Sequence, residues 1–327
     1  MTEQLIDTFG RVHRDLRISV TDRCNFRCTY CMPEEGMEWT PRDELLTFEE
    51  IERVASILVN RFGIDGIRLT GGEPTVRARL PVLVKKLATL GVDLALTTNG
   101  ATLRLVADDF KAAGLKRLNI SLDTFDRDRF IELTRRDELD KVLDGIDAAI
   151  EAGFSPVKIN AVIMKGINDD EILDFVEFGR RKGVVVRFIE FMPLDADQSW
   201  SNDKVLSQQD IVDTIAAAHP IEPIERGSSP AARWRYTDGG GEVGVIATVT
   251  QAFCESCDRI RLTAEGAFRN CLFATGEYDM RAMLRSGATD DDIADALKGA
   301  VHDKWAGHQI GQVHFIRPKK SMSQIGG

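Results

Sequence analysis

The chain has 327 residues, enough for one large domain or two ordinary ones, and its 43% hydrophobic and 29% charged residues are typical of a soluble globular protein. The net charge of −10 argues against general nucleic-acid binding, which favours a basic surface. No apolar run is long enough to cross a membrane, and the N-terminus lacks a signal-like stretch. We therefore expect a cytoplasmic protein whose thiols stay reduced.

Short aliphatic runs alternate with amphipathic helical patterns through the first 193 residues. A capping box, Thr47 with Glu50 three residues later, marks the start of the first helix. The aliphatic runs are apolar on both faces, which favours parallel strands covered by helices. Six strands are too few for a closed eight-stranded barrel, so the pattern predicts an α/β fold with an open, partial (βα)6 barrel. We expect its strands over residues 16–21, 66–72, 93–100, 117–123, 157–164 and 184–192.

Polar residues gather where these strands end. In parallel barrel-like folds the carboxyl ends of the strands form the rim that carries the chemistry. Chance would give one or two polar ends, but five of the six strands have one. The sequence therefore predicts a site at this rim, around residues 70–73, 97–99, 121–123, 160 and 190–192.

The pattern changes after Pro193. Residues 195–240 are richer in Pro, Ser, Gln and Gly, and residues 237–250 read as a turn followed by a strand. We interpret residues 1–193 as the barrel and residues 194–327 as a smaller α+β domain with antiparallel strands and a helical end.

The six cysteines form two groups of three. Cys24, Cys28 and Cys31 follow the first strand, and Cys254, Cys257 and Cys271 lie in the second part of the chain. In a reducing compartment such groups are metal ligands or catalytic groups more often than disulfides. Three thiolates on a cube of four irons leave one iron open for a ligand. The alternatives are zinc sites completed by distant ligands, or unrelated thiols. The second group could also be capped by His302, His308 or His314.

Four arginines adjoin the cysteine groups. Arg259 and Arg261 alternate between Cys257 and Cys271, Arg17 alternates with apolar neighbours in the first strand, and Arg68 precedes residues 70–73. Any one of these could be an ordinary surface arginine. Because guanidinium groups suit phosphate oxygens, four of them in an acidic protein indicate an anionic, phosphorylated substrate.

The first cysteine loop resembles that of radical S-adenosylmethionine (SAM) enzymes, in which three thiolates hold a [4Fe–4S] cluster whose open iron binds SAM. Tyr30 matches the aromatic residue that this family often places beside the adenine. The GGEP sequence of residues 71–74 resembles the family's second motif, where glycine lets the backbone approach a ligand. The resemblance implies reductive cleavage of SAM to a 5′-deoxyadenosyl radical.

Both cysteine groups together, in this order over about residues 15–327, resemble the branch of that family that cyclises GTP in molybdenum cofactor biosynthesis. The resemblance implies two [4Fe–4S] clusters, one on Cys24, Cys28 and Cys31 and one on Cys254, Cys257 and Cys271. It implies SAM contacts from Tyr30, Gly72, Ser121 and Met192. It implies GTP contacts from Arg17, Arg68, Thr97, Lys158, Arg259 and Arg261, with Asn160 and Arg187 as further contacts.

The terminal glycines belong to the same resemblance, which implies that Gly326 and Gly327 reach into the site and assist the rearrangement. One departure is Gly66, where the family often has Lys two residues before Arg68. A positive charge near the substrate is therefore missing from this chain.

The implied reaction is that of a lyase. The adenosyl radical takes the ribose 3′ hydrogen of GTP, and the ribose radical attacks carbon 8 of guanine, giving (8S)-3′,8-cyclo-7,8-dihydroguanosine 5′-triphosphate. The implied partners are an electron donor and a downstream cyclic pyranopterin monophosphate synthase, without nucleic acid or membrane; the oligomeric state, a homodimer included, stays open.

Two other functions compete. A radical enzyme acting on a peptide would usually carry more cysteines in its C-terminal part. A non-catalytic iron–sulfur electron carrier would need neither GGEP nor the polar strand ends.

Overall fold

The computed structural model describes residues 3–195, 199–312 and 315–326. Its strands are β1 (Asp15–Ser19), β2 (Gly66–Thr70), β3 (Asp93–Thr98), β4 (Arg117–Ser121), β5 (Val157–Ile163), β6 (Val185–Glu190), β7 (Ile221–Ile224), β8 (Ala232–Tyr236), β9 (Glu242–Ile246), β10 (Arg259–Leu262), β11 (Ala267–Arg269) and β12 (Tyr278–Asp279). Its helices are α1 (Phe48–Phe62), α2 (Leu80–Ala88), α3 (Leu103–Ala112), α4 (Arg127–Thr134), α5 (Leu139–Glu151), α6 (Ile172–Lys182), α7 (Gln208–Ala218), α8 (Met280–Arg285), α9 (Asp290–His302) and α10 (Met322–Ile325).

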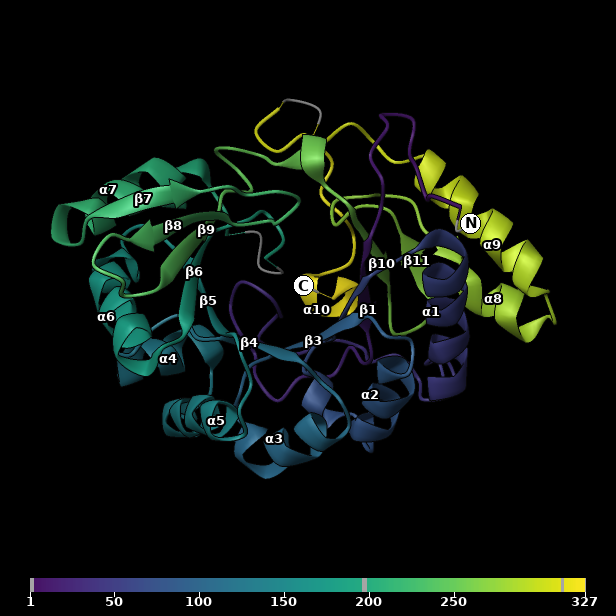
Figure 1. Cartoon of the computed structure of the whole chain (residues 1–327), viewed down its shortest axis with the longest axis horizontal. Helices are drawn as coiled ribbons and strands as arrows, with labels where there is room; N and C mark the ends of the chain where they lie inside the picture. Colours follow the sequence, from purple (N-terminus) through teal and green to yellow (C-terminus); the bar gives the residue numbers. More distant parts are fainter. Residues whose placement is uncertain (1–2, 196–198, 313–314, 327) are drawn as a thin grey trace.

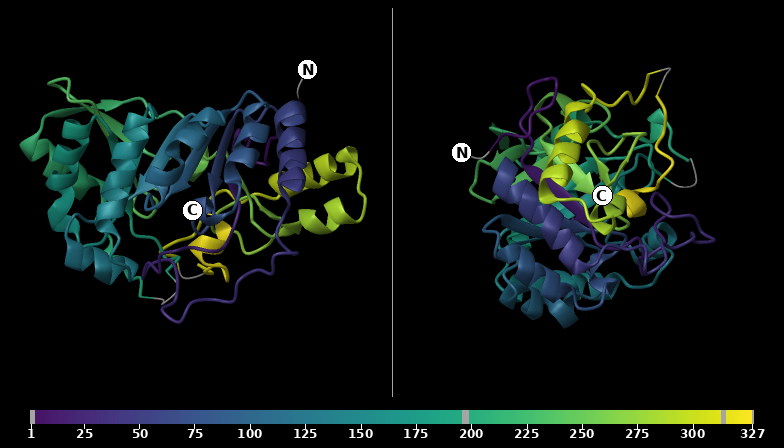
Figure 2. Two further views of the ribbon diagram at one scale, coloured as in Figure 1. Left: turned by 90° about the horizontal axis from the view of Figure 1, so that it is seen from below. Right: turned by 90° about the vertical axis from the view of Figure 1, so that its right-hand side faces the viewer.

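Strands β1 to β6 run parallel in sequence order and curve into an arc with the helices α1 to α6 outside it (Figure 1). The arc does not close, so the predicted partial (βα)6 barrel is confirmed. The short C-terminal helix α10 lies on the inner, open side of the arc in the first view and stays close to the sheet in the two others (Figure 2). The inner side of the arc is therefore reached by the end of the chain.

The strands of the second half extend the same sheet at both edges. β10 pairs in parallel with β1, and β9 pairs in parallel with β6. Antiparallel strands follow at each edge, giving the order β12-β11-β10-β1-β2-β3-β4-β5-β6-β9-β8-β7. The predicted turn and strand after residue 237 correspond to the hairpin of β8 and β9. The division of the chain at residue 193 stays a prediction, because one sheet contains strands from both sides of it.

Capping residues determine where helix α1 begins and ends, and one continuous hydrophobic core packs it against the sheet. The predicted capping box starts α1, and Gly63 ends it in the left-handed conformation, φ 71°. The apolar stripe of α1 packs into one cluster of buried side chains that also contains Leu16 of β1, Ile260 of β10 and Val243 of β9. The second half of the chain is thus anchored by the same hydrophobic core as the barrel.

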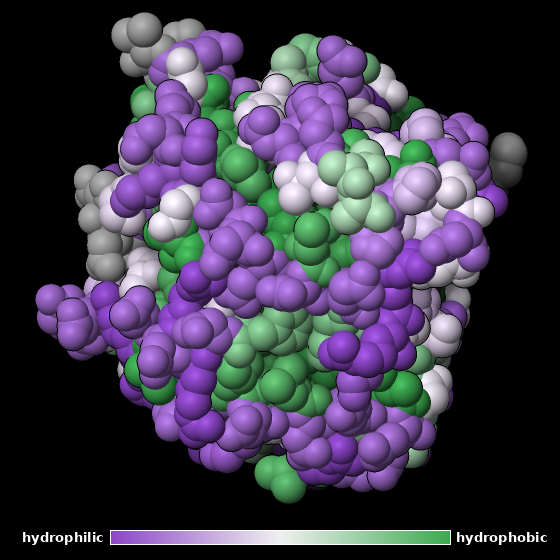
Figure 3. Space-filling view, turned by 90° about the vertical axis from the view of Figure 1, so that its left-hand side faces the viewer, coloured by the Kyte–Doolittle hydropathy of each residue, from purple (hydrophilic) through white to green (hydrophobic). Residues whose placement is uncertain are grey.

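The outer surface is mainly polar. On the side of α6, α7 and β7, hydrophilic residues cover most of the face and hydrophobic residues show between them (Figure 3). Within the described residues, no helix has the length and apolar character that crossing a membrane requires.

Candidate functional site

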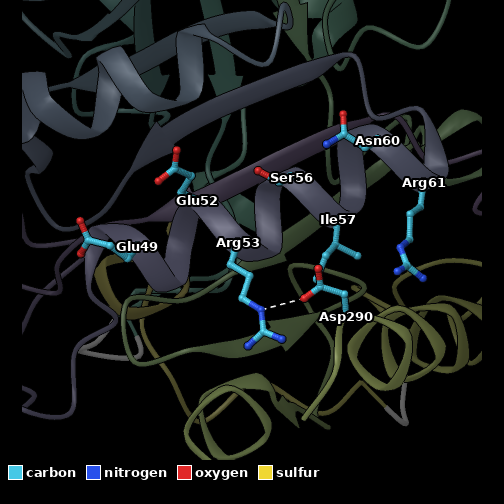
Figure 4. A pocket seen from close by; sticks show the side chains of 8 residues that line it. All are labelled: Glu49, Glu52, Arg53, Ser56, Ile57, Asn60, Arg61 and Asp290. Carbon is cyan, nitrogen blue, oxygen red and sulfur yellow. Dashed lines mark hydrogen bonds and ion pairs between the residues drawn. The ribbon is translucent and has the colours of Figure 1, made fainter. Parts of the chain in front are cut away.

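Two pockets differ sharply in character. One is a groove of charged side chains between α1 and the start of α9, where Arg53 points toward Asp290 and their Nε and Oδ1 atoms are 2.8 Å apart (Figure 4). Its other charged side chains are also paired, Arg61 with Asp291 and both Glu49 and Glu52 with Lys86. The other is a cavity of about 280 Å³ at the inner side of the barrel. The cavity is lined by seventeen of the residues predicted to bind the clusters, SAM or GTP: Arg17, Cys24, Cys28, Tyr30, Cys31, Arg68, Gly72, Thr97, Ser121, Asn160, Arg187, Met192, Cys254, Cys257, Arg259, Arg261 and Cys271.

The first cysteine group lies in the loop after β1. The Phe26 backbone N–H donates to Cys24 Sγ at 3.3 Å, and Ser323 from the C-terminal helix contributes a hydrogen bond to Cys31. Burial raises the pKa of Cys24 to about 12 and that of Cys31 to about 11. The free thiols are therefore protonated at neutral pH, and metal binding would release protons.

Gly71 and Gly72 allow this loop to approach the end of β2. A Cβ on Gly72 would lie 2.5 Å from the carbonyl oxygen of Arg23, and a Cβ on Gly71 would lie 2.5 Å from that of Thr21. Both positions are too crowded for a side chain. The glycines of GGEP thus bring the chain that carries Cys24 against β2, in addition to the predicted approach to a ligand.

Two buried carboxylates organise the part of the cavity beside the first cysteine group. Glu73 accepts hydrogen bonds from Thr75 Oγ1 at 2.6 Å, Thr98 Oγ1 at 2.7 Å and Asn99 N at 2.6 Å, which ties the end of β2 to the end of β3. Asp123, after β4, accepts a hydrogen bond from Tyr30 Oη at 2.5 Å. Burial raises the pKa of Asp123 to about 6, although bonds from Tyr30 and the Val162 backbone oppose the shift.

Three arginines stand side by side across three neighbouring strands. Arg261 of β10 is in register with Arg17 of β1, which is in register with Arg68 of β2. Register partners point to the same face of a sheet, and here all three line the cavity. The Nε of each is buried without a hydrogen-bond partner among the described residues. Since buried polar groups are normally paired, this arginine row fits a bound polyanion.

Burial, followed by the charges of Arg68 and Arg261, lowers the pKa of Arg17 well below its ordinary value. Asp15 offers only weak compensation, with its Oδ1 3.9 Å from Arg17 Nε. Arg259 adds a fourth guanidinium, whose NH2 is also buried and unpaired in the described structure. Burial would lower the pKa of Arg259, but the charges of Cys257, Asp258 and Asp15 outweigh it and raise that pKa.

Lys158 lies near the cavity without lining it. It is on β5, two residues before Asn160, which does line the cavity together with Arg187. Arg187 Nε donates to Asn160 Oδ1 at 3.0 Å. Burial, then the charge of Arg187, lowers the pKa of Lys158 to about 8. Its predicted GTP contact stays a prediction.

The second cysteine group lines the same cavity as the first. Cys254 is the first residue of a short helical turn before β10, Cys257 follows that turn, and Cys271 follows β11. Burial would raise the pKa of Cys257, but Arg259 and Lys304 outweigh it and lower the pKa to about 6. A cysteine that ionises this readily is suited to bind metal.

The six free thiols, the donors to their sulfur atoms and the shared cavity fit two iron–sulfur clusters. In the described parts of the chain, no three His, Cys, Asp or Glu side chains converge on a single ion position.

Of the three histidines considered as caps, one lies in the cavity. His308 lines it, with Nε2 buried and unpaired in the described structure. His302 is exposed beside Asp303, and His314 falls outside the described residues.

Gly326, near the end of the chain, packs against the last residues of β1 and β2. Ser323 lines the cavity, and Gly326 has φ 82°; a Cβ there would lie 2.5 Å from Thr70 Oγ1. The structure therefore brings Gly326 to the site, although it is not among the lining residues, while Gly327 lies outside the described residues. Sequence reasoning missed Ser323, and named Asp123 only as part of a strand end. It also missed Arg11 and Lys304 beside the second cysteine group, which no local motif signals.

The comparisons with known proteins agree with this geometry. Residues 18–179 match the profile of the radical SAM superfamily, and residues 184–310 match that named Molybdenum Cofactor Synthesis C. The crystal structure of SuiB from Streptococcus suis bound to S-adenosylmethionine superposes with a TM-score of 0.62, covering 90% of this chain and 69% of that one, at 14% identity. The chain is a radical SAM enzyme by fold and by cysteine motif.

Full-length relatives define it further. The GTP 3′,8-cyclase of Streptomyces coelicolor is 49% identical, with 99% of this chain and 96% of the relative covered. That of Rhodopirellula baltica is 47% identical, covering 99% and 92%. The chain belongs to the GTP 3′,8-cyclase family. The predicted cofactors, SAM and [4Fe–4S] clusters, are confirmed at the level of the family.

Proposed function

We propose that this chain converts GTP to (8S)-3′,8-cyclo-7,8-dihydroguanosine 5′-triphosphate in molybdenum cofactor biosynthesis. The observation that carries the proposal is the arginine row of Arg261, Arg17 and Arg68, with buried unpaired Nε atoms, in a cavity shared by two cysteine groups. A peptide or an electron carrier has no evident use for this polyanion site. A nucleoside triphosphate fits both the charge and the enclosed cavity.

The cysteine groups divide the cavity between cofactor and substrate. Cys24, Cys28 and Cys31 hold the cluster that binds SAM, and Tyr30, Gly72, Ser121 and Met192 contact SAM itself. Cys254, Cys257 and Cys271 would hold the second cluster, which would supply a binding position for the substrate. The bound cofactors supply a 5′-deoxyadenosyl radical able to remove the ribose 3′ hydrogen.

The chain's own residues supply position and shielding. Arg17, Arg259 and Arg261 bind the triphosphate, while Arg68, Thr97 and Lys158 bind elsewhere on GTP. Fixing both ends of the nucleotide holds the ribose 3′ carbon beside carbon 8 of the base, which replaces an entropic search with a near-attack geometry. Gly326 lies beside the ends of β1 and β2, and the two terminal glycines, Gly326 and Gly327, assist the rearrangement.

Further partners follow from the same reaction. Reductive cleavage of SAM requires an electron donor, and we expect a downstream cyclic pyranopterin monophosphate synthase to consume the cyclised nucleotide. We infer a cytoplasmic location, because six free cysteines need a reducing compartment. A homodimer is the assembly to test first, since twofold dimers are the commonest oligomers.

Deuterium transfer tests the proposal directly. The anaerobically reconstituted and reduced protein is given SAM and GTP deuterated at the ribose 3′ position, and GTP deuterated at 2′ serves as the matched control. We expect deuterium in 5′-deoxyadenosine only from the 3′ label, together with a cyclised product. Cleavage of SAM by loaded protein without any deuterium transfer would reject GTP as substrate and favour a peptide.

A further inference from the structure

A lysine lies buried beside the second cysteine group. Lys304 follows α9 and is only 3% exposed. Its Nζ is 2.9 Å from His13 Nε2, 2.9 Å from the carbonyl oxygen of Arg259 and 3.6 Å from Cys257 Sγ. Within the described residues, Lys304 forms no ion pair with a carboxylate. A buried ammonium group is costly without a counter-charge, and the sulfur of Cys257 is the anion within its reach.

His13 holds this lysine from the opposite side. The imidazole is fully buried, and burial followed by the charge of Lys304 lowers the pKa of His13 to about 3, so the ring is neutral. His13 Nδ1 is 3.3 Å from the carbonyl oxygen of Leu5 and therefore carries the proton. That tautomer leaves Nε2 as an acceptor for Lys304. The ammonium group is thus directed by two close acceptors, His13 and the Arg259 carbonyl, and its remaining hydrogen faces Cys257, whose carbonyl oxygen is 3.4 Å and whose Sγ is 3.6 Å from Nζ.

Arg11 braces the same region from the N-terminal segment. Its NH1 donates to the carbonyl oxygens of Cys254 and Ala306, both at 2.8 Å, and its Nε donates to Asp7 at 2.6 Å. A Cβ on Gly307 would lie 3.3 Å from Cys254 Sγ, so the chain at Gly307 passes close to the sulfur atom of Cys254. The position of Lys304 is therefore fixed by the fold from both ends of the chain.

We propose that Lys304 is a positioning residue that donates a hydrogen bond to Cys257 Sγ and raises the reduction potential of the second cluster. Hydrogen bonds to cluster sulfur atoms and nearby positive charge favour the reduced, more negative form. The proposal rests on the proposed binding of that cluster by Cys254, Cys257 and Cys271. The proposed effect is on the reduction potential of the second cluster, which no sequence motif predicts.

The test isolates the second cluster in the full-length chain. Replacing Cys24, Cys28 and Cys31 by Ser removes the ligands of the first cluster, so the remaining paramagnetic signal belongs to the second. Its midpoint potential is then measured by redox titration followed by electron paramagnetic resonance. Iron content and circular dichroism are recorded for every variant.

We expect Lys304→Met to shift the reduction equilibrium at least tenfold toward the oxidised cluster, a midpoint lower by about 59 mV for one electron. Lys304→Arg keeps charge and donors and should stay near the parent value. Lys304→Gln keeps a donor without the charge and should fall between them. The matched control is Lys298→Met on α9, whose side chain is 52% exposed and pairs with Glu3; it should leave the potential unchanged.

Equal potentials for the fully loaded Lys304→Met and Lys298→Met variants would overturn the proposal. If Lys304→Met does not retain iron, Lys304→Gln is compared with Lys298→Met instead. A potential of Lys304→Gln equal to that of the parent would also refute the proposal. If the parent of the series forms no cluster at all, the proposed binding by the second cysteine group is wrong and the role of Lys304 falls with it. The two failures are therefore distinguishable.

Discussion

Replacing Arg261 by Met should separate substrate binding from folding. Arg261 is 5% exposed and adjoins Arg17 in register, and its Nε has no hydrogen-bond partner in the described structure. Burial lowers its pKa to about 10, although the thiolates of Cys271 and Cys257 oppose the shift. The folded protein without substrate therefore carries a cation that it does not stabilise.

The magnitude follows from that pKa. A fall from 12.5 to about 10 corresponds to a cost of roughly 3 kcal/mol for keeping Arg261 charged in the fold, at about 1.36 kcal/mol per unit. At pH 7 the residue is charged in both the folded and the unfolded state, so the whole cost is present. Methionine fills comparable space without the charge. We expect a free energy of unfolding without GTP that is unchanged or higher by up to about 3 kcal/mol.

The affinity of the Arg261→Met variant for GTP, in contrast, should decrease. A lost hydrogen bond to a charged group costs about 1.5–3 kcal/mol, which weakens affinity about 10- to 150-fold. Titration calorimetry under anaerobic conditions measures the affinity of the reconstituted variant, and urea unfolding without GTP measures its stability.

Arg269→Met is the matched control. Arg269 is the register partner of Arg261 on β11 and equally buried, but it pairs with Glu277, donates to the carbonyl oxygen of Ala274 and does not line the cavity. This variant should lose about 1–3 kcal/mol of stability and keep the parent affinity. An Arg261→Met variant that binds GTP like the parent, or that loses stability and affinity together, would refute the reasoning.

The remaining predictions concern the charge of Lys158 and the close backbone packing at Gly72 and Gly326. Because the protonated form of Lys158 attracts phosphate and its pKa is about 8, GTP affinity should fall up to about tenfold from pH 7 to pH 9, and Lys158→Met should abolish that dependence in calorimetry; an unchanged pH profile contradicts the contact. Gly72→Ala should lose first-cluster iron, because its Cβ would collide with the loop carrying the cysteines, whereas Gly276→Ala, in open space, should retain it in an iron assay. Gly326→Ala should release the C-terminal tail and speed its digestion by carboxypeptidase, and Gly299→Ala should not; equal digestion rates would show that the tail is not held there.

Much of the barrel could be predicted because its signals are local. The capping box at Thr47 and the aliphatic runs identified α1 and the six parallel strands within a few residues of their observed ends. The pairing of β10 with β1 and of β9 with β6 could not be predicted. Strand pairing between distant segments depends on which hydrophobic faces meet in the folded core, and periodicity along one segment carries no information about its partner.

The residues of the site also fall into those that the sequence predicts and those that it does not. The cysteine groups and GGEP are contiguous motifs, so they were visible in the sequence. Lys304 and His13 come from opposite ends of the chain and meet only because the N-terminal segment packs against the turn after α9. The family resemblance placed Lys158 among the GTP contacts, and that contact stays a prediction; two residues further along β5, Asn160 lines the cavity.

The arginine row shows that the second half of the chain contributes residues directly to the site. Arg17 and Arg68 belong to the barrel, whereas Arg261 comes from β10, and only the register of β10 against β1 brings the three together. The same strand follows directly on Cys257, so one pairing positions both the phosphate site and the second cysteine group. Such a row of buried cations opposes folding, and it persists because the hydrophobic core continues from β1 into β10 through Leu16 and Ile260. Substrate binding removes the repulsion that the core overcomes, so the site that costs stability in the free protein is the one that GTP would stabilise most.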